Sequence, residues 1–568
     1  MNRGRAGSAV SPSKTVVPSR AVAKGFRMQG TMMNYPLTLI HVLERAGKLF
    51  PESEVLSRLP DRSLHRCTYA DVYRRARALA EALQKAGVGR GERVATLMWN
   101  HYAHLEAYLG IPSAGLVMHT LNLRLAPREI AYIANHGGGR FLIVDDILLP
   151  LYDQIKDATK FERVFVVPLT GKPVPSGTES YEDFLGTVGG DFRYPDLEEN
   201  EPACLCYTSG TTGVPKGVAY THRSVFLHTF LLTTADNFAI CHADVLLPVV
   251  SMFHVNGWGM PYAAAMVGCK LLLPGPYLDP ESLLQLCAKE NVTVAAGVPT
   301  IWLSVIDYLE KHPGRYKLPP MRVLVGGAAP PLALIRTLDH YGIKLQQGWG
   351  LTESSPQATT NQLKAHMRKW PQEQRYEAQS LAGIPVPLVD VRVVNDSGEV
   401  PRDGQTLGEV QLRGPWVAAS YYNLPEETNK WTGDGWFRSG DVGTVDAEGY
   451  LKIADRTKDL IKSGGEWISS VDLENALVAH PDVREAAVIA VPHPKWQERP
   501  VAVVVAKDGA KLTPEQLREF LTGKFAKWQL PDAVIFVDEL PHTSTGKLLK
   551  TELRRRYREW TWGGNIGG

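Results

Sequence analysis

The most informative stretch of this sequence is Tyr207-Thr-Ser-Gly-Thr-Thr-Gly-Val-Pro-Lys-Gly-Val218. Hydroxyl side chains, glycines and a lysine lie close together in it, at Thr208, Ser209, Gly210, Thr211, Thr212, Gly213, Lys216 and Gly217. Glycines let backbone N–H groups turn inward on a small anion, and hydroxyl and ammonium groups can complete the cradle. The stretch therefore predicts a loop that binds phosphate.

Two other interpretations of this loop are weaker. An ordinary surface loop rich in glycine and threonine would have the same composition. The P-loop of nucleoside triphosphatases has the pattern G-x-x-x-x-G-K-[ST]. Here Lys216 follows Pro215 and precedes Gly217, so no Ser or Thr follows the lysine to hold magnesium. We interpret the stretch as a phosphate loop of another kind.

Length and composition indicate a globular protein with more than one domain. The chain has 568 residues, which is too many for a single hydrophobic core. Apolar residues make up 44% and charged residues 21% of the chain, as in ordinary globular proteins. The net charge of +2 gives no reason to expect nucleic acid or an anionic membrane as a partner. No run approaches the roughly 18 apolar residues that would predict an integral membrane segment.

The cysteines and the N-terminal residues indicate which cellular compartment to expect. The six cysteines show no CxxC spacing, and Cys204 and Cys206 alternate along an expected strand, which favours buried thiols over a metal site. A reducing compartment follows, and we expect the cytoplasm. Residues 1–31 contain several arginines, lysines and serines and no acid, so they fit either an organelle transit peptide, of mitochondrial type, or a disordered extension.

From Leu37 onwards the pattern alternates between strands and helices. Thr68 and Asp71 form an N-cap pair ahead of an apolar helical stripe. The expected strands include 93–98, 141–144, 163–167, 270–273, 292–296, 322–325 and 343–345, and expected helices include one that begins at Pro280 and one over 300–309. Repeated strand–helix units predict an α/β fold with mostly parallel sheets.

The later part of the chain has a different pattern. Short strands between turns, such as 391–394 and 408–412, predict a small β-rich subdomain. Helices over 470–479 and 514–521 alternate with strands over 486–491, 501–505 and 534–537, which predicts a small α+β domain. We therefore expect an extension (1–31), a large N-terminal domain (32–457), a C-terminal domain (458–560) and a tail (561–568).

The glycine- and threonine-rich stretch resembles the signature of the adenylate-forming enzymes, which include acyl- and aryl-CoA synthetases, luciferases and the adenylation domains of peptide synthetases. The resemblance spans roughly residues 35–558. It looks closest to bacterial-type medium- or long-chain fatty-acyl-CoA synthetases, because the undivided run Asp459-Leu-Ile-Lys-Ser-Gly-Gly-Glu-Trp-Ile-Ser-Ser-Val-Asp-Leu-Glu474 is typical of them.

This resemblance implies a reaction and its ligands. A fatty acid would be joined to the α-phosphate of ATP with release of pyrophosphate, and the acyl group would then pass to the thiol of CoA. ATP, Mg²⁺ and CoA are the implied cofactors and co-substrates. The N-terminal domain would bind the acid and ATP, and the small C-terminal domain would be mobile. Bacterial members are often homodimers, so a homodimer is one expected state.

The resemblance also assigns nucleotide-binding roles in the first domain. Gly327, in Gly326-Gly-Ala-Ala-Pro330, would let a flat ligand approach the backbone. Gln347-Gly-Trp-Gly-Leu-Thr-Glu353 resembles the second nucleotide motif, including Gln347 and Gly348, with Trp349 where an aromatic residue, commonly Tyr, flanks the adenine. Thr352 would donate to the α-phosphate, and Glu353 would ligate Mg²⁺ with the aid of Thr208.

Further roles follow for the region around the domain boundary. Asp441 would accept both ribose hydroxyls, Arg456 would assist at the ribose or the phosphates, and Lys458 lies where the two domains of the family hinge. Lys462 and Trp467 would border the nucleotide. Gly464 and Gly465 would let the narrow thiol-bearing chain of CoA pass.

The last motif, Thr543-Ser-Thr-Gly-Lys547, places Lys547 in a glycine-containing loop. In the family this lysine bridges the carboxylate and the α-phosphate and stabilises charge in the transition state. With Lys216, Thr352 and Glu353 it completes the implied catalytic set. The basic residues of the following helix, Lys550, Arg554, Arg555 and Arg556, are expected to form a solvated face.

The sequence says less about the carboxylic acid substrate than about the other ligands. Ser251-Met-Phe-His-Val-Asn-Gly-Trp258 corresponds to the acyl-pocket motif, in which His254 replaces the aspartate of amino-acid-activating domains. Val255 would add to an apolar wall, and Trp258 lies where an aromatic residue gates the acyl tunnel in some long-chain synthetases. Ordinary core packing is the alternative for these residues.

Other functions remain open on this fold. The same chemistry could serve a short, branched, aryl or methylthio-alkanoic acid, because pocket volume decides and the sequence does not supply it. A luciferase-like oxidative enzyme is a remote alternative. A nucleotide-binding protein that has lost catalysis would be expected to lack Lys547, Glu353 or Asp441, and all are present.

Overall fold

The computed structural model describes residues 30–208, 214–456, 458–463, 466–542, 548–558 and 560, without the side chain of Glu466. Residues Leu37–Gly568 form one compact unit, and Met1–Pro36 cluster separately from it. The expectation for residues 1–31 therefore lies almost wholly outside the described residues. Among the described helices, none is long and apolar enough to cross a membrane.

The first sheet carries the phosphate-loop stretch on its edge. Its strand order is β7-β6-β5-β3-β4-β8-β9, and its pairs are parallel except β8 with β9. The strands are β3 (Arg93–Leu97), β4 (Val117–Thr120), β5 (Phe141–Asp145), β6 (Arg163–Val167), β7 (Glu179–Ser180), β8 (Pro202–Tyr207) and β9 (Gly217–Thr221). The hairpin of β8 and β9 thus holds both ends of the predicted phosphate loop.

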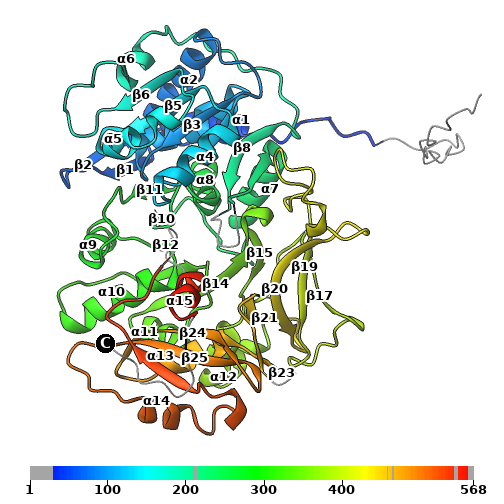
Figure 1. The fold of residues 1–568 in the computed structure, drawn as a ribbon. Helices are drawn as coiled ribbons and strands as arrows, with labels where there is room; N and C mark the ends of the chain where they lie inside the picture. Colours follow the sequence, from blue (N-terminus) through cyan, green and yellow to red (C-terminus); the bar gives the residue numbers. More distant parts are fainter. Residues whose placement is uncertain are drawn as a thin grey trace, which may run out of the picture. The chain divides into compact units, whose positions relative to one another are not determined.

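The second sheet has the order β16-β15-β14-β13-β12-β10-β11-β1-β2. Figure 1 labels β1, β2, β10, β11, β12, β14 and β15 of this sheet. Its central pairs, from β14 through β13, β12, β10 and β11 to β1, are parallel. The strands are β1 (Glu54–Arg58), β2 (Leu64–Thr68), β10 (Val245–Pro248), β11 (Lys270–Leu273), β12 (Val294–Gly297), β13 (Met321–Val325), β14 (Ile343–Gly350), β15 (Gln357–Thr360) and β16 (Ile384–Pro385).

Helices fill the space between these sheets and cover their outer faces. One apolar cluster joins inward-facing residues of both sheets to α1 (Ile40–Leu49), α2 (Tyr69–Lys85), α3 (Tyr102–Ser113) and α8 (Met260–Val267). A second cluster places α9 (Pro280–Glu290), α10 (Pro299–Lys311) and α11 (Leu332–His340) on the outer face of the second sheet. A third places α4 (Pro127–Gly137) and α5 (Leu149–Asp153) on the outer face of the first.

The packing of α2 against α3 follows from local sequence. Thr68 and Asp71 form the predicted capping box at the start of α2. Helix α3 is buried on nearly all sides, as expected for a helix that is apolar all round. A Cβ at Gly110 of α3 would lie 2.5 Å from the carbonyl oxygen of Ala76 in α2, so only glycine allows this close approach.

The third sheet is the predicted β-rich subdomain. It consists of β17 (Asp390–Asn395), β18 (Gly398–Glu399), β19 (Gly408–Arg413), β20 (Phe437–Val445) and β21 (Leu451–Arg456), in the order β18-β17-β19-β20-β21. All its pairs are antiparallel. In the pairing of β20 with β21, Asp441 lies opposite Arg456, so two predicted site residues are neighbours across strands.

The C-terminal part is the predicted α+β domain. Its sheet pairs β23 (Glu466–Ile468), β22 (Ile461–Ser463), β25 (Gln497–Ala506) and β24 (Val483–His493) in that order, and β26 (Ala533–Phe536) joins β25. Its helices are α13 (Ser470–Val478), α14 (Pro514–Leu521) and α15 (Lys550–Arg556). The remaining helices of the larger part are α6 (Tyr181–Gly186), α7 (His222–Leu232) and α12 (Gln372–Gln379).

Several expected strand boundaries were wrong. Strands β24 and β25 extend beyond the expected 486–491 and 501–505, and two differences in the second sheet have a clear cause. Strand β12 begins at Val294, because the N–H of Val292 bonds to the carbonyl of Cys287 and closes α9 after the left-handed residue Asn291. Strand β14 continues to Gly350, because it gains an antiparallel partner in β15. Gln347, Gly348 and Trp349 therefore lie on a strand rather than after it.

A buried ion pair should be a major support of the α2–α3 packing. Arg75 Nε lies 2.6 Å from Oε1 of Glu106, whose side chain is only 1% exposed. Burial raises the pKa of Glu106, and removal of its cationic partner would leave an unpaired acid in the core. We expect Arg75→Leu to lower the free energy of unfolding by about 3 kcal/mol, measured by urea denaturation.

The control is the neighbouring arginine of the same helix. Arg74 contacts Asp71 at 3.3 Å, and both side chains are well exposed. Arg74→Leu should change the free energy of unfolding by less than about 1 kcal/mol. Equal losses in the two variants would show that burial of Glu106 is not the cause.

Candidate active site

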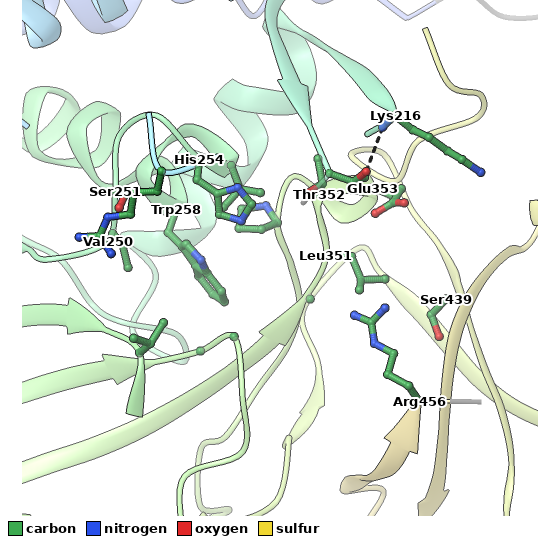
Figure 2. A pocket seen from close by; sticks show the side chains of 18 of the residues that line it. Lys216, Val250, Ser251, His254, Trp258, Leu351, Thr352, Glu353, Ser439 and Arg456 are labelled. Carbon is green, nitrogen blue, oxygen red and sulfur yellow. Dashed lines mark hydrogen bonds between the residues drawn. The ribbon is translucent and has the colours of Figure 1, made fainter. Parts of the chain in front are cut away.

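A cavity of about 380 Å³ opens where the second sheet, the β8–β9 hairpin and the third sheet meet. It is lined by predicted site residues from distant parts of the chain, namely Thr208, Lys216, His254, Val255, Trp258, Gly327, Thr352, Glu353, Arg456 and Lys458. Figure 2 shows His254 and Trp258 on one side of this cavity and Thr352, Glu353 and Arg456 on the other. The carboxyl ends of parallel strands are where such ligand sites form.

A second cavity of about 310 Å³ shares part of this lining. Gly327, Arg456 and Lys458 border both cavities. The second one adds the predicted adenine and ribose residues, Gln347, Gly348, Trp349 and Asp441. The chain therefore gathers most of its predicted site residues into two adjoining spaces.

Some predicted residues cannot be placed in this way. Ser209, Gly210, Thr211, Thr212, Gly213, Gly464, Gly465 and Lys547 lie outside the described residues. Lys462 and Trp467 are paired across β22 and β23, with the Lys462 ammonium 5.4 Å from the centre of the Trp467 ring. Neither lines the two cavities, and Trp467 is 42% exposed.

The base of the phosphate loop is closed by hydrogen bonds. The N–H of Thr208 donates to the carbonyl of Lys216 over 3.0 Å. The N–H of Lys216 donates in return to Oγ1 of Thr208, also over 3.0 Å. The Lys216 ammonium lies 2.6 Å from Oε1 of Glu427. The backbone of this lysine is therefore held, while its charge is paired with an acid from another segment.

Glu353 is held from both its backbone and its side chain. The N–H of Ala418 donates to its carbonyl over 2.7 Å, and the hydroxyl of Tyr220 donates to the carbonyl of Thr352 over 2.6 Å. The hydroxyl of Tyr421 donates to Oε1 of Glu353 over 2.5 Å. Burial, and then the charge of Glu353, raise the pKa of Tyr421, so its hydroxyl remains a donor.

These groups fit a magnesium site that is completed by a substrate. Within the described part of the chain, no cluster of three or more His, Cys, Asp and Glu side chains could hold a metal ion by itself. Magnesium bound with a triphosphate needs only one or two protein oxygens, since phosphate and water supply the rest. Glu353 and Thr208 both line the cavity and offer oxygens of the required kind.

Asp441 receives a protein donor on each carboxylate oxygen. The indole N–H of Trp349 donates to Oδ2 over 3.1 Å, and Nε of Arg456 lies 2.6 Å from Oδ1. The charge of Asp441 raises the pKa of Arg456. Asp441 is only 4% exposed at its side chain. Its orientation is therefore set before any ligand arrives, as a carboxylate that binds ribose hydroxyls would require.

An unusual left-handed turn positions Trp258. Successive residues Val255, Asn256, Gly257, Trp258 and Gly259 all have positive φ, at 41°, 53°, 53°, 56° and 69°. For residues with a Cβ this conformation costs roughly 1–2 kcal/mol each, and β-branched Val is among the least suited. Nothing in the sequence analysis predicted this turn. The strain is offset by packing, because Val255 and Trp258 are both buried.

The Trp258 ring packs against the backbone at Gly326 and Gly348. A Cβ at Gly326 would lie 2.6 Å from Cζ2 of that ring, and one at Gly348 would lie 3.1 Å from Cζ3. The indole therefore rests directly on the backbone at the ends of β13 and β14. This contact explains the glycines of both motifs by close packing as well as by ligand approach.

The predicted solvated face of the last helix was partly wrong. Lys550 lies 2.7 Å from Oε1 of Glu474, both side chains are only 10% exposed, and burial raises the pKa of Glu474 to about 7. Arg554 forms an ion pair with Asp459. Arg555 and Arg556 pair with Glu552 within the helix, as expected of surface residues. A charge pattern along one helix cannot reveal buried acids on another element.

Contacts also form at the predicted hinge. The N–H of Ser470, in the first turn of α13, donates to Oδ2 of Asp455 over 2.9 Å. Asp455 is the penultimate residue of β21, which ends at Arg456, and lies three residues before Lys458. Burial lowers the pKa of Lys458. Strand β21 thus meets the start of α13 through the Asp455 carboxylate, and the ion pair of Lys452 with Asp472 over 2.9 Å adds a second polar contact there.

Sequence reasoning missed several residues of the site. Tyr421 and Glu427 lie in a loop whose sequence matches no motif that we recognised, and only their contacts with Glu353 and Lys216 reveal them. Trp496 and Trp528 are 41% and 42% exposed, and Trp496 adjoins Gln497, which pairs with Ser463 at the end of β22. The guanidinium of Arg499 joins Ser463 Oγ to the carbonyl of Trp528. Both residues therefore lie near the end of β22, and their rings offer flat apolar surface.

Comparisons with known proteins identify relatives over nearly the whole chain. The profile of the AMP-binding enzyme family matches residues 43–422, and that of the AMP-binding enzyme C-terminal domain matches residues 472–547. A long-chain-fatty-acid–CoA ligase of Thermus thermophilus is 51% identical, over 94% of this chain and 98% of the relative. A 3-methylmercaptopropionyl-CoA ligase of Ruegeria pomeroyi is 43% identical, over 94% and 99%.

A further relative and two solved structures agree with this pattern. A medium-chain-fatty-acid–CoA ligase of Ectopseudomonas oleovorans is 41% identical, over 93% of this chain and 98% of the relative. The crystal structure of the anthranilate CoA ligase AuaEII with anthranoyl-AMP has a TM-score of 0.83 at 26% identity, covering 92% and 98% of the chains. ATP-bound MatB from Rhodopseudomonas palustris has a TM-score of 0.77 at 26% identity, covering 92% and 99%.

The contact between Trp258 and Gly326 can be tested by a double-mutant cycle. A methyl group at residue 326 would overlap the indole, and overpacking of this kind costs about 1–3 kcal/mol. We expect Gly326→Ala to lower the free energy of unfolding by that amount in the wild type, and by less than half of it when Trp258→Ala is also present.

A methyl group elsewhere supplies the control for this cycle. A Cβ at Gly186 would meet no heavy atom within 4 Å, so Gly186→Ala should have little effect in either background. The same loss from Gly326→Ala with and without the indole would contradict the packing described here.

Proposed function

This chain belongs to the AMP-binding enzyme family, and from that premise we propose that it is a fatty-acid–CoA ligase that works through an acyl-adenylate. A carboxylate oxygen of the acid attacks the α-phosphorus of ATP, and the bond to the β-phosphate breaks to release pyrophosphate. The CoA thiol, on losing its proton, then attacks the acyl carbon, and AMP leaves. Oxidation states do not change in either step.

One observation carries the proposal most directly. In the first cavity Lys216, Thr352 and Arg456 lie on one side, and Val250 and Trp258 lie on the other together with Ser251 and His254 (Figure 2). This cavity shares part of its lining with the one beside Asp441 and Trp349. Thr208, Lys216, Thr352 and Arg456 suit phosphate, while Val255 and Trp258 suit an alkyl chain. A fatty acid bound between them would present its carboxylate to the phosphates.

Each residue has a role in this proposal. Thr352 and Lys216 hold the phosphates, Asp441 and Arg456 hold the ribose, and Gln347, Gly327 and Trp349 enclose the adenine. Mg²⁺ would be held by Glu353 and Thr208 together with the triphosphate, whose negative charge it would reduce when bound. Lys547 would stabilise the charge that develops between the carboxylate and the α-phosphate.

The second step needs a path for CoA. We assign that path to Gly464 and Gly465, which lie between β22 and β23 in the sequence, with the C-terminal domain turning about Lys458. Lys462 and Trp467 border the nucleotide in one orientation of this domain. Residues 32–457 and 458–560 would then be the two moving parts. The same proposal includes a location in the reducing cytoplasm and a homodimeric state.

A shorter or substituted acid is the second candidate. Methylthio-alkanoic acids are favoured among these, because a 3-methylmercaptopropionyl-CoA ligase is 43% identical to this chain. That relative falls between the long-chain ligase at 51% and the medium-chain ligase at 41%. Sequence identity alone therefore does not decide between the two kinds of substrate, so activity must be measured with each acid.

The proposal is tested by a substrate series. Release of AMP and pyrophosphate, dependent on ATP and CoA, is measured for unbranched acids from acetate to palmitate and for 3-methylmercaptopropionate. We expect the highest kcat/KM among medium- or long-chain acids. A preference for acids of a few carbons would replace the fatty acid by the second candidate.

In the same series Trp258→Ala should lower KM for the longest acids severalfold, because it removes the indole ring that lines the cavity.

The role of Lys547 is tested by separating the half-reactions. Lys547→Ala should slow acyl-adenylate formation by at least about 100-fold, since it removes a charge that acts on the transition state. Thioester formation from supplied acyl-adenylate and CoA should be largely retained. Arg555→Lys, which keeps a cation at an exposed position of the following helix, is the control. Equal loss of both half-reactions in Lys547→Ala would contradict the assignment.

A further inference from the structure

The lysine of the phosphate loop is paired with an acid that the mechanism above does not use. Its ammonium lies 2.6 Å from Oε1 of Glu427 and 5.1 Å from the centre of the Tyr421 ring. Glu427 directly precedes a short helical turn over Thr428–Lys430, in the connection between β19 and β20. The phosphate loop and this connection thus meet through opposite charges.

The geometry allows Lys216 to move without its backbone. The hydrogen bonds with Thr208 fix the main chain at the base of the loop, but the ammonium ends a flexible four-carbon stem. Figure 2 draws this side chain pointing away from Thr352, although Lys216 lines the same cavity. The lysine can therefore exchange its position at Glu427 for one directed at a phosphate bound near Thr352.

The strength of the pair suits such an exchange. The side chains of Lys216 and Glu427 are 25% and 29% exposed, so water screens their attraction. Pairs of this kind contribute little, equivalent to roughly a 1.4- to fivefold change in an equilibrium constant. A polyphosphate carries several negative charges and can displace one carboxylate at that cost. A fully buried pair would hold the lysine too firmly.

The other acids of the cavity are engaged differently. Glu353 accepts from the hydroxyl of Tyr421, and Asp441 pairs with Arg456 and Trp349. Glu427 is instead paired with Lys216, the cation of the phosphate loop. It does not line either cavity described above, so it can approach the lysine without occupying the position of a ligand.

We propose that Glu427 is a positioning residue that competes with polyphosphate for Lys216. The triphosphate of ATP takes the lysine from Glu427 on binding, and Glu427 takes it back as pyrophosphate leaves. The carboxylate thereby weakens the hold on the product. This inference rests on the proposed function, since it requires that the cavity bind ATP and release pyrophosphate.

Glu427→Gln tests the inference, because it keeps the size of the side chain and removes its charge. Calorimetric titration of the free protein with pyrophosphate should give a dissociation constant about two- to fivefold lower than that of the wild type. The inhibition constant of pyrophosphate and the KM for ATP should fall by similar factors. These differences should shrink as salt is added, because a partly exposed pair is screened.

Two controls separate this role from a structural one. Glu426→Gln changes the exposed neighbouring acid and should leave pyrophosphate binding unaltered. In a Lys216→Met background, Glu427→Gln should no longer tighten pyrophosphate binding, because the lysine that transmits the effect is gone. Glu427→Asp, which retains the charge on a shorter stem, serves as a second variant if Glu427→Gln folds poorly, and it should also tighten binding.

The results are distinguishable. Unchanged or weaker pyrophosphate binding in folded Glu427→Gln, or the same tightening without Lys216, would overturn the inference while the ligase activity of the wild type stands. A wild type that binds no pyrophosphate and releases none with any acid would overturn the proposed function instead.

Discussion

Parallel strands place their carboxyl ends along one edge of a sheet, and the cavity of this protein depends on that geometry. Strands β10, β12, β13 and β14 run side by side, so the segments after them reach the same place. One of these segments carries His254 and Trp258, another Gly327, and another Thr352 and Glu353. The β8–β9 hairpin and the third sheet bring Lys216 and Arg456 to this edge. Residues that are far apart in the sequence become neighbours because the strands that precede them are adjacent in the sheet.

Charge governs how these neighbours are arranged. Two cations that line the cavity are paired with acids, Lys216 with Glu427 and Arg456 with Asp441. The pair of Arg456 with Asp441 is set before a ligand binds and so reduces the reorganisation that binding requires, whereas in our proposal Lys216 leaves Glu427 when polyphosphate binds. The pairs differ in burial. Asp441 is 4% exposed and is held by Trp349 as well, whereas Glu427 is 29% exposed. The first suits a fixed ligand-binding group and the second an exchangeable one.

Packing at the apolar end follows a different principle. The left-handed turn from Val255 to Gly259 is unfavourable in isolation, and it persists because the buried Trp258 ring rests on Gly326 and Gly348. The packing of the ring offsets the backbone strain of the turn, and the lack of a side chain at Gly326 and Gly348 makes that packing possible. Gly326 also lines the first cavity and Gly348 the second, so a side chain at either position would narrow one of the two spaces.

Local patterns in the chain were sufficient for its elements and for the chemistry of its motifs. The capping box at Thr68, the alternation of strands and helices, and the glycine-rich motifs depend on neighbours within a few residues, so they can be read without a fold. The family comparisons confirm the type of enzyme that these motifs indicated. The burial of Lys550 beside Glu474, the contact of Tyr421 with Glu353 and the pairing of Lys216 with Glu427 could not be read in this way. Each joins residues from separate elements, and no local pattern records which acid a folded chain will bring to a given cation.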